Sequence, residues 1–520
     1  MNEYLLFAIA IIPIAWLIVS LGILKFPAHK TCLFTAILTF IIALIFWKIS
    51  FLNAVTASIE GILIAIWPIL LVIVAALFTY NLAVETKSMD TMKKMLSSIT
   101  TDQRIQVLIL AWGFGGFLEA VAGYGTAVAI PASILASIGF NPIFAAIICL
   151  IANTVPTAFG AIGIPVTTLA TVTGLDVMKL SYLISIQLAP FIIIIPFALV
   201  ILTKKSFKAI KGVFWITLVS GLAFAVPQIF VAKYLGAELP ALIGSLCSML
   251  ATVIMAKSMN KKQSKLEIGS EESQDCDVVA QSKVTFREGL LAWLPYILLC
   301  ILILIASPLF PSINEFLAQF TSKIQIYTGE GAKATSFTWI NTPGMMIIIS
   351  TFIAGLIQKV KISTMLNVFI ATIKQLTKSF ITITSIVAIS KIMSYSGMTS
   401  SISFGLCAIT GSFYPIISPL LGSIGTFVTG SDTSANILFG GLQTQAATSL
   451  GISPYWIAAA NTAGATAGKM ISPQSIAIAT SATGLIGKEG KIFSSTVKFC
   501  LGYVIILGIL VYFGSYFFTI

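Results

Sequence analysis

Charged residues are scarce in this sequence: Asp, Glu, Lys and Arg together make up 9% of its 520 residues, while 58% are hydrophobic. Soluble domains carry about 25% charged residues. A water-soluble protein of this length needs polar groups to cover its surface, because the surface grows with the size of the protein. The scarcity of charge excludes a soluble globular protein and indicates a chain that is embedded in a lipid bilayer.

Residues that hold metals or build disulfide frames are also few. The single histidine, His29, lies in a basic turn between two apolar runs, and the seven cysteines are scattered without a CxxC pair. Such cysteines are typical small apolar fillers. The sequence has neither a GxxxxGK[ST] loop nor an HExxH motif. We therefore expect no metal site, no cofactor, no ATP-driven pump and no enzyme.

The basic residues outnumber the acidic ones, 30 to 18, which gives a formal net charge of +12. They gather in short hydrophilic segments at 25–30, 85–104, 204–211, 257–289 and 488–498. Cytoplasmic loops of membrane proteins carry such an excess of Lys and Arg. We therefore predict that these segments lie in the cytoplasm, that the N-terminus starts outside, and that nucleic acid is not a partner.

Apolar runs are long and unbroken, which predicts membrane-spanning helices rather than the alternating strands of a barrel. The run at 4–24 has no Lys before it and no small-residue cleavage site, so we expect a first span and not a signal peptide. Counting short runs in pairs predicts about 12 to 14 crossings. The fold class is thus an all-α polytopic membrane protein. The hydrophilic segment 257–289 is predicted to be a cytoplasmic linker between membrane halves 1–256 and 290–520.

The two halves share a pattern. Residues 153–165 and 461–473 both read NTxxxxxGxxxxP, and upstream Gly113 and Gly116 match Gly422 and Gly425 at nearly the same offset. We interpret this as an internal repeat. Secondary transporters with repeated halves bind their solute near the bilayer midplane, where broken or re-entrant helices meet.

Two acidic residues lie in apolar surroundings. Glu119 lies in the glycine-rich stretch 112–131, and Asp432 follows Gly430 in the stretch 425–441. A carboxylate at membrane depth is costly and normally faces a cavity or a partner. We predict that Glu119 and Asp432 couple transport to a proton. Two alternatives stay open: Glu119 hydrogen-bonds the broken backbone around it, and Asp432 caps a half-helix. The repeat aligns Asp432 with Gly123, so the two acids are not copies of each other.

Lys469 lies between two apolar runs, where a cation needs an anionic partner, either a protein carboxylate or a substrate; the alternative is a side chain that reaches the membrane interface. Half-helices expected to start near Asn153 and Asn461 would offer free N–H groups to an anion. The predicted substrate-binding residues are Asn153, Thr154, Ser431, Thr433, Asn461, Thr462, Lys469, Ser472 and Gln474. The predicted helix breaks are Gly113, Gly123, Gly125, Gly160, Pro165, Gly430, Gly468 and Pro473.

Three other charged residues are predicted to lie away from the site. Glu60 opens an apolar run and is expected at the membrane interface. Lys374 and Lys391 are assigned to an amphipathic surface helix or the end of a span, around 358–378.

Several segments resemble the bacterial L-lactate permease family: SIEGILIAIWPILLVIVAALFTYNLAVETKS, GFGGFLEAVAGYGTAVAIPASIL, NTVPTAFGAIGIPV, GSDTSANILFGGLQ and NTAGATAGKMISPQSIAIA. The resemblance implies a proton-coupled carrier for L-lactate, and for related 2-hydroxy acids such as glycolate and D-lactate, in the cytoplasmic membrane. It places Glu119, Asn153, Ser431, Asp432, Asn461, Lys469, Ser472 and Gln474 in family motifs. Tyr124 departs from the Phe expected there, and a phenol near the site would alter selectivity.

The resulting hypothesis places a lactate carboxylate on Lys469 and a proton on Glu119 or Asp432, so that loading both cancels the charge. The partners would be lactate or a related acid, a proton and membrane lipid. One rival is a sodium-coupled carrier of dicarboxylates or other organic anions. The other is a passive channel or a membrane-embedded enzyme. The preferred hydroxy acid, the net direction of flux and a homo-oligomeric state stay open.

Overall fold

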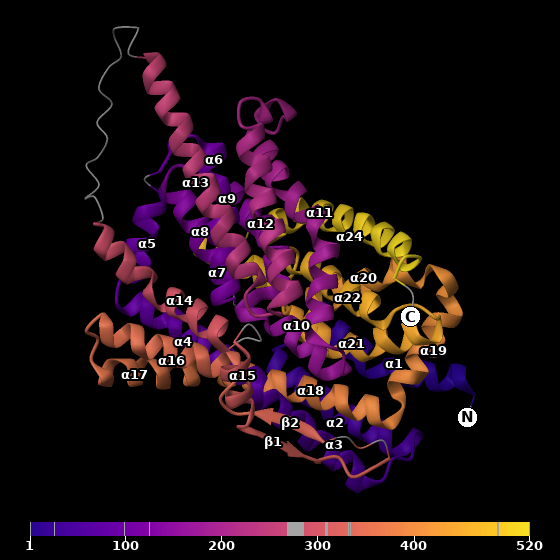
Figure 1. Cartoon of the computed structure of the whole chain (residues 1–520). Helices are drawn as coiled ribbons and strands as arrows, with labels where there is room; N and C mark the ends of the chain where they lie inside the picture. Colours follow the sequence, from indigo (N-terminus) through magenta and orange to yellow (C-terminus); the bar gives the residue numbers. More distant parts are fainter. Residues whose placement is uncertain are drawn as a thin grey trace.

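The computed structural model describes residues 2–24, 26–97, 99–123, 125–267, 285–306, 310–330, 332, 334–485 and 488–518. This part of the chain is a bundle of helices with one small β-hairpin (Figure 1). Twelve of its helices are long and apolar enough to cross a membrane, and three shorter apolar helices cover 126–137, 142–152 and 343–357. The prediction of an all-α polytopic membrane protein is confirmed.

The elements follow one another along the chain with short connections. Up to residue 267 they are α1 (Glu3–Leu17), η1 (Ile18–Ile23), α2 (Ala28–Phe46), α3 (Phe51–Ile64), η2 (Ala65–Leu70), α4 (Leu71–Glu85), α5 (Ser88–Ser97), α6 (Gln103–Val107), η3 (Leu108–Phe114), α7 (Gly115–Val121), α8 (Thr126–Ser137), α9 (Pro142–Ala152), η4 (Pro156–Phe159), α10 (Gly160–Thr173), α11 (Val177–Lys204), η5 (Phe207–Ile210), α12 (Phe214–Tyr234) and α13 (Pro240–Glu267).

From residue 285 the elements are α14 (Phe286–Ala306), α15 (Pro311–Ala318), β1 (Thr321–Ile324), β2 (Thr335–Thr338), α16 (Pro343–Ile357), α17 (Ile362–Gln375), α18 (Thr377–Ser396), α19 (Met398–Thr410), η6 (Gly411–Phe413), α20 (Tyr414–Thr429), α21 (Asp432–Ser449), α22 (Pro454–Lys469), α23 (Pro473–Thr483) and α24 (Glu489–Ser515). The strands pair antiparallel, with Thr321 opposite Thr338. The sequence analysis predicted no strand.

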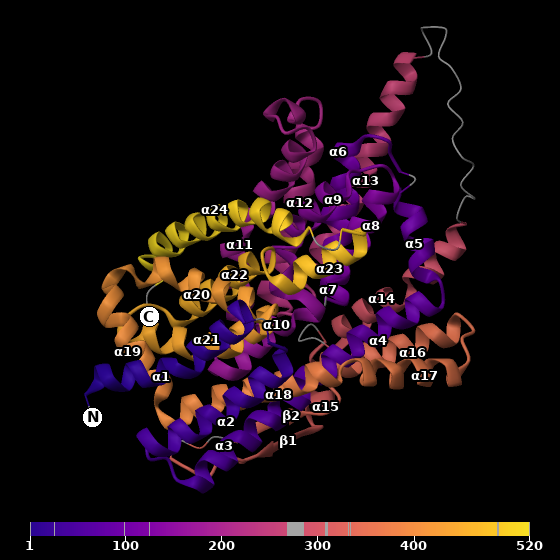
Figure 2. The same cartoon turned by 180° about the vertical axis from the view of Figure 1, so that it is seen from behind.

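Segments far apart in the sequence pack together. Helix α18 contacts α2 and α3, α4 contacts α16, and α20 contacts α22 and α24, while α11, α12 and α13 pack in sequence order. Figure 2 shows the same arrangement from behind, with α23 beside α8. Helix α10 contacts α21, which brings together two segments that are far apart in the sequence. This crossing positions the candidate site.

Several helices are interrupted where glycine or proline requires it. The 35-residue span 51–85 is broken at Trp67, whose φ of −133° and ψ of 117° leave the helical region before Pro68. Between α7 and α8, Gly123 and Gly125 have φ of 58° and 83°, which a residue with a side chain rarely adopts. In α10 a turn of positive φ runs from Ala161 to Gly163. The breaks at Gly123, Gly125 and Ala161 line one pocket, and the break at Trp67 lines a second one.

The predicted linker begins later than expected, because α13 continues as a helix to Glu267. Residues 268–284 lie outside the described residues, and the division into two membrane halves stays a prediction. The repeat also stays a prediction. Asn153 ends α9, whereas Asn461 lies inside α22, so the shared pattern adopts two different backbones. A short 3-10 helix, η4, begins at Pro156, close to Asn153, whereas Asn461 lies in the middle of α22, so the expectation of a half-helix that starts nearby is wrong for Asn461.

Glu60 is buried in the interior of the protein. Its side chain is 1% exposed, and its Oε1 lies 2.9 Å from Nζ of Lys391. The same oxygen accepts a hydrogen bond of 2.9 Å from the hydroxyl of Tyr395. Lys391 therefore belongs to α18 and a buried ion pair, while Lys374 lies exposed in the last turn of α17. Lys391 lies near the end of the candidate span Thr377–Ser396, which is one of the two places predicted for it. The pairing with Glu60 was not predicted, because composition does not show which charges meet.

Candidate functional site

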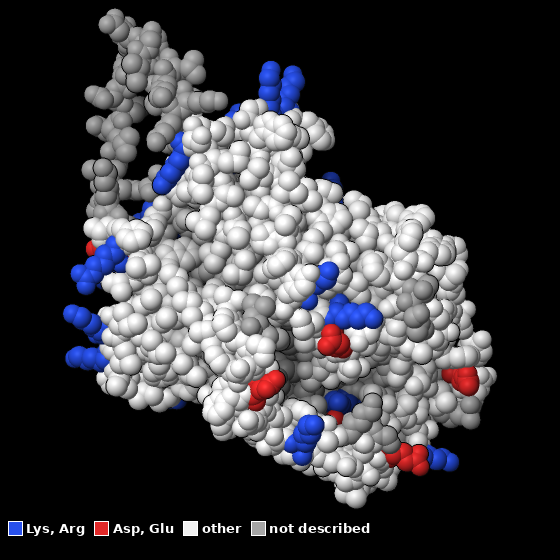
Figure 3. Space-filling model, viewed as in Figure 1, with Lys and Arg blue, Asp and Glu red and all other residues white. Residues whose placement is uncertain are grey.

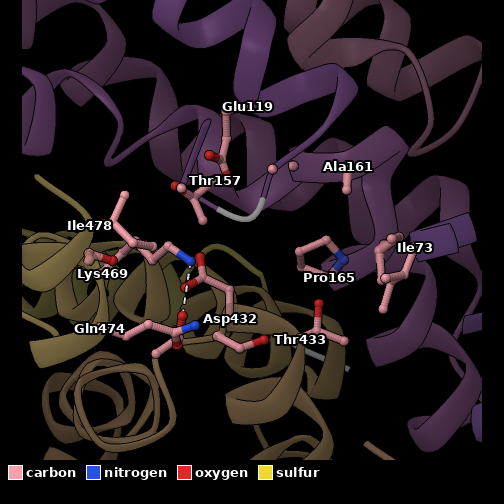
Figure 4. A pocket seen from close by; sticks show the side chains of 17 residues that line it. Ile73, Glu119, Thr157, Ala161, Pro165, Asp432, Thr433, Lys469, Gln474 and Ile478 are labelled. Atoms are coloured by element: carbon pink, nitrogen blue, oxygen red, sulfur yellow. Dashed lines mark hydrogen bonds between the residues drawn. The ribbon is translucent and has the colours of Figure 1, made fainter. Parts of the chain in front are cut away.

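A pocket of about 80 Å³ lies where α7, the broken start of α10, α21 and the α22–α23 turn come together (Figure 4). We call it the central pocket. Its lining residues are Ile73, Glu119, Gly123, Gly125, Thr157, Gly160, Ala161, Ile164, Pro165, Gly430, Ser431, Asp432, Thr433, Lys469, Gln474, Ser475 and Ile478. Gln474 is the exposed residue of this set, so the pocket reaches the surface beside α23.

Glu119 is buried in one wall of the central pocket, with 2% of its surface exposed. A Cβ at Gly160 would lie 2.8 Å from its Oε1, so position 160 has no room for a side chain. The other carboxyl oxygen, Oε2, has no hydrogen-bond partner among the described residues. An orphaned buried oxygen is costly. The alternative that Glu119 merely satisfies the broken backbone does not account for this free oxygen.

Asp432 lies in the opposite wall and is also 2% exposed. Helix α20 ends at Gly430, whose φ is 73°, and α21 begins two residues later. The hydroxyl of Ser431 caps α21 by accepting a hydrogen bond of 3.3 Å from the N–H of Ser434. Asp432 is therefore not the cap of this helix. Neither of its carboxyl oxygens has a hydrogen-bond partner among the described residues.

Lys469 is the last residue of α22 and points into the central pocket beside Asp432 (Figure 4). Its Nζ donates a hydrogen bond of 2.9 Å to the carbonyl oxygen of Gly430. Within the described ranges it forms no ion pair, although three other cations do. A half-buried ammonium group and two buried carboxyl groups thus share one small space without a direct contact between the charges.

Polar side chains complete the wall around Lys469. Ser431, Thr433 and Gln474 were predicted as binding residues, and all three line the central pocket. A Cβ at Gly430 would lie 2.0 Å from Oε1 of Gln474. Position 430 therefore requires glycine for two reasons: its φ is positive, and the side chain of Gln474 occupies the space where a Cβ would lie. The resulting surface offers hydroxyl and amide donors close to a cation.

Asn461 and Thr462 lie outside the central pocket, in a buried network. Their side chains donate to Oδ1 of Asn436 at 2.9 and 3.1 Å, and Nδ2 of Asn436 donates to the carbonyl oxygen of Pro165 at 3.0 Å. The network joins α22 and α21 to the broken helix α10. The network therefore holds these walls of the central pocket in a fixed position relative to each other.

Three more predicted binding residues support the wall from behind. Nδ2 of Asn153 donates to the hydroxyl of Thr157 at 3.3 Å, and Thr154 donates to the carbonyl oxygen of Leu150. Ser472 caps α23 and accepts a hydrogen bond from the N–H of Ser475. None of the three lines the central pocket, so they position its wall and do not face its interior.

The predicted helix breaks fall into two groups. Gly123, Gly125, Gly160, Gly430 and Pro473 lie at the ends or starts of helices. Gly113 and Gly468 lie inside η3 and α22, so they do not end a helix. Pro165 lies two residues after the positive-φ turn that interrupts α10, at the start of the regular helix that follows. A Cβ at Gly468 would lie 2.1 Å from the carbonyl oxygen of Ser423, which shows that this glycine serves close helix packing. The prediction about Tyr124 lies outside the described residues.

Six lining residues were not predicted: Ile73, Thr157, Ala161, Ile164, Ser475 and Ile478. Thr157, Ala161 and Ile164 lie within the repeated pattern at 153–165, so that pattern could have indicated them. Ile73 comes from α4, far away in the sequence, and nothing local marks it. No cluster of three or more His, Cys, Asp or Glu able to hold a metal ion occurs in the described ranges.

Residues 6–518 match the family model described as L-lactate permease. An L-lactate permease of Streptococcus iniae is 51% identical over 451 residues, which cover 87% of this chain and 93% of the relative. In Escherichia coli K12, an L-lactate permease is 34% identical over 539 residues, covering 100% of this chain and 97% of the relative. The glycolate permease GlcA of the same strain is also 34% identical, covering 98% and 96%.

Among solved structures, Neisseria gonorrhoeae MtrF, from a class described as antimetabolite efflux pumps, aligns with a TM-score of 0.51 at 12% identity. The alignment covers 94% of this chain and 96% of MtrF. At this identity the likeness shows the fold alone. The chain is therefore a multi-pass bacterial membrane protein with the fold of a membrane transporter.

Proposed function

This chain belongs to the L-lactate permease family, and we propose on that basis that it carries L-lactate and related short 2-hydroxy acids, such as glycolate, together with a proton. The substrate class is supported by the names of relatives that match along nearly the whole chain. Proton coupling is supported by the composition of the central pocket. One observation carries the mechanism: Lys469 faces two buried carboxyl groups, and none of the three forms an ion pair within the part of the chain that the structure describes.

Lys469 is the anchor for the substrate carboxylate. Its ammonium group has a carbonyl oxygen as its single hydrogen-bond acceptor among the described residues, which leaves donors free for an anion. Ser431, Thr433 and Gln474 can hydrogen-bond the 2-hydroxyl group of the substrate. One cation in the pocket matches a monocarboxylate better than a dicarboxylate, because a second carboxylate would face Glu119 or Asp432.

Glu119 and Asp432 are the candidate proton carriers. Like charges in one small pocket cannot easily both ionise, so a proton is readily shared between them. A lactate anion and one proton add no net charge to the pocket. A fully loaded site can therefore change its exposure to the two sides of the membrane more easily than a site that holds the anion alone.

Uptake into proteoliposomes under an imposed pH gradient tests this function. We expect labelled L-lactate and glycolate to accumulate when the outside is more acidic, and a protonophore to abolish the accumulation. Succinate and a sodium gradient serve as comparisons. Sodium-driven uptake without a pH gradient, or accumulation of succinate but not lactate, would contradict the proposal and favour a sodium-coupled dicarboxylate carrier. Equilibration without accumulation would indicate a channel.

A further inference from the structure

A second cavity, of about 180 Å³, lies on the other side of the broken segment of α10. We call it the outer cavity. It is lined by Trp67, Pro68, Ile69, Val72, Ile162, Ile164, Thr167, Thr168, Thr171, Ser336, Thr338, Asn341, Thr342 and Pro343. Thr171 and Ser336 are exposed at its rim, while Ile69 and Ile164 are buried at its floor. The cavity therefore leads from the surface into the bundle.

Two hydroxyl groups in this cavity are buried and have no partner. Thr168 is 1% exposed and Thr342 is 4% exposed, and neither Oγ1 has a hydrogen-bond partner among the described residues. Buried hydroxyl groups are normally satisfied, because an unpaired one loses its hydration without compensation. Both therefore point to a polar group that the cavity receives.

The rest of the lining suits a small hydroxy-carboxylate. Ile69, Val72, Ile162 and Ile164 offer an apolar wall for a methyl group, and hydroxyl groups and the amide of Asn341 offer hydrogen bonds. No charged side chain is among the lining residues. An uncharged site binds an anion weakly. Weak binding suits a site along a transport path, because the solute must also leave it.

Ile164 lines both cavities and is 3% exposed. Its neighbours in the chain line one space or the other: Ala161 and Pro165 line the central pocket, and Ile162 lines the outer cavity. Figure 4 places Pro165 and Ile73 at the end of the central pocket away from Lys469. On α4, Ile73 lines the central pocket and its neighbour Val72 lines the outer cavity. One layer of apolar side chains thus separates the two spaces.

Chain tracing gives the side to which the outer cavity opens. The segments 204–211 and 257–289 are predicted to be cytoplasmic from their lysines. Helix α11 crosses once between the end of α10 and the first of these segments, and α14 crosses once between the second segment and the hairpin β1–β2. Both routes place Thr171 and Ser336 outside the cell.

We propose that the outer cavity is a second, external binding subsite for the short 2-hydroxy acid, and that Ile164 is the barrier between this subsite and Lys469. The inference rests on the proposed function for the identity of the substrate. The indole of Trp67 donates a hydrogen bond of 2.8 Å to the carbonyl oxygen of Thr338, which fixes the hairpin over the cavity.

Removal of single hydroxyl groups tests the subsite. In Thr168→Val and Thr342→Val, we expect the KM for external lactate to rise about two- to tenfold, the effect of one hydrogen bond, with kcat unchanged. Thr168→Ser keeps a hydroxyl group at this position and should therefore have the KM of the unmodified chain. Folding should not suffer, because these hydroxyl groups have no partner to lose. Thr31→Val is the matched control, since Thr31 also has a buried hydroxyl without a partner but lies on α2, away from both cavities.

Labelling tests the side and the occupant. Thr168→Cys in intact cells should react with a membrane-impermeant maleimide above the level of the parent chain, and lactate should slow the reaction. An unchanged KM in both valine variants would overturn the inference, and so would labelling of Thr168→Cys that occurs only in inverted vesicles. In either case, lactate uptake by the unmodified chain would still support the proposed function. Absence of uptake by the unmodified chain, measured first in the same assay, would instead refute the proposed function.

Discussion

At the scale of single residues, the central pocket depends on groups that are buried without the partners that burial normally requires. Glu119 and Asp432 keep free carboxyl oxygens, and Lys469 has a carbonyl oxygen where an ion pair would be expected. Such an arrangement is unfavourable in a protein without a ligand, and under the proposed function it becomes favourable once a carboxylate and a proton enter. The residues are therefore better explained by a ligand than by stability.

Replacement of the cation tests its role as anchor. In Lys469→Ala we expect lactate uptake to fall to background while the protein still reaches the membrane, because the substrate carboxylate loses its charged partner. Lys374→Ala is the control, since Lys374 is exposed on α17 and lies outside the pocket. Uptake assays and a membrane-fraction blot measure both. A normal KM in Lys469→Ala would remove Lys469 from the site.

Space at position 160 provides a second test. Gly160→Ala places a Cβ 2.8 Å from Oε1 of Glu119, so the carboxyl group must move. We expect uptake to drop at least about tenfold, since small displacements of a positioned group have effects of this order. Gly502→Ala in α24 meets no atom within 4 Å and should leave uptake intact. Equal activity of the two variants would show that the position of Glu119 is unimportant.

At the scale of secondary structure elements, α3 and α18 are joined by the buried pair of Glu60 and Lys391. The pair is supported by Tyr395, whose ring stacks on that of Tyr327 at a centroid distance of 3.7 Å. The pair lines neither the central pocket nor the outer cavity. It fixes α3 and α18 against each other.

Breaking this pair on one side should destabilise the protein. Lys391→Met leaves the Glu60 carboxylate buried and unpaired, at a cost of about 3 to 5 kcal/mol. We expect a lower melting temperature in detergent, and a partial recovery in the double variant Glu60→Gln and Lys391→Met. Lys378→Met on the same helix removes an exposed cation and should melt like the parent. A parent-like melting temperature for Lys391→Met would mean that the pair contributes little.

At the scale of the whole molecule, charged side chains are few, and basic ones project from the upper end and from the left edge of the view in Figure 3. Most of the surface in this view is uncharged. The exposed lysines of the segment 204–211 around η5 are Lys204, Lys205, Lys208 and Lys211. The β-hairpin lies toward the other end of the view in Figure 1. The positive-inside rule then predicts that the η5 end lies in the cytoplasm.

This orientation is testable without any assumption about transport. Ser336→Cys, on the hairpin, should react with an impermeant thiol reagent in intact cells. Lys208→Cys should react only after the membrane is opened. Gel-shift labelling with a bulky maleimide measures both sites in the same cells. The reverse result would invert the topology and place the outer cavity on the cytoplasmic side.

The sequence by itself determined the class of this protein. Apolar runs of about 20 residues are stable as helices that span a bilayer. The polytopic helical fold could therefore be predicted from the length and composition of these runs. Glu119, Asp432 and Lys469 could also be found, because an isolated charge in an apolar run is visible in one dimension. The glycines at 123, 125, 160 and 430 were visible as interruptions of helical sequence.

Only the tertiary structure decided which of these residues meet. Asn461 and Thr462 have the same side chains as Asn153 and Thr154 and the same spacing to glycine and proline, yet one pair lies in a continuous helix and the other at a helix end. The same limit hid Ile73 and Ile164, and the pairing of Glu60 with Lys391. Spacing along the chain fixes neighbours within one helix, but contacts between helices depend on how their surfaces pack, which no short segment encodes.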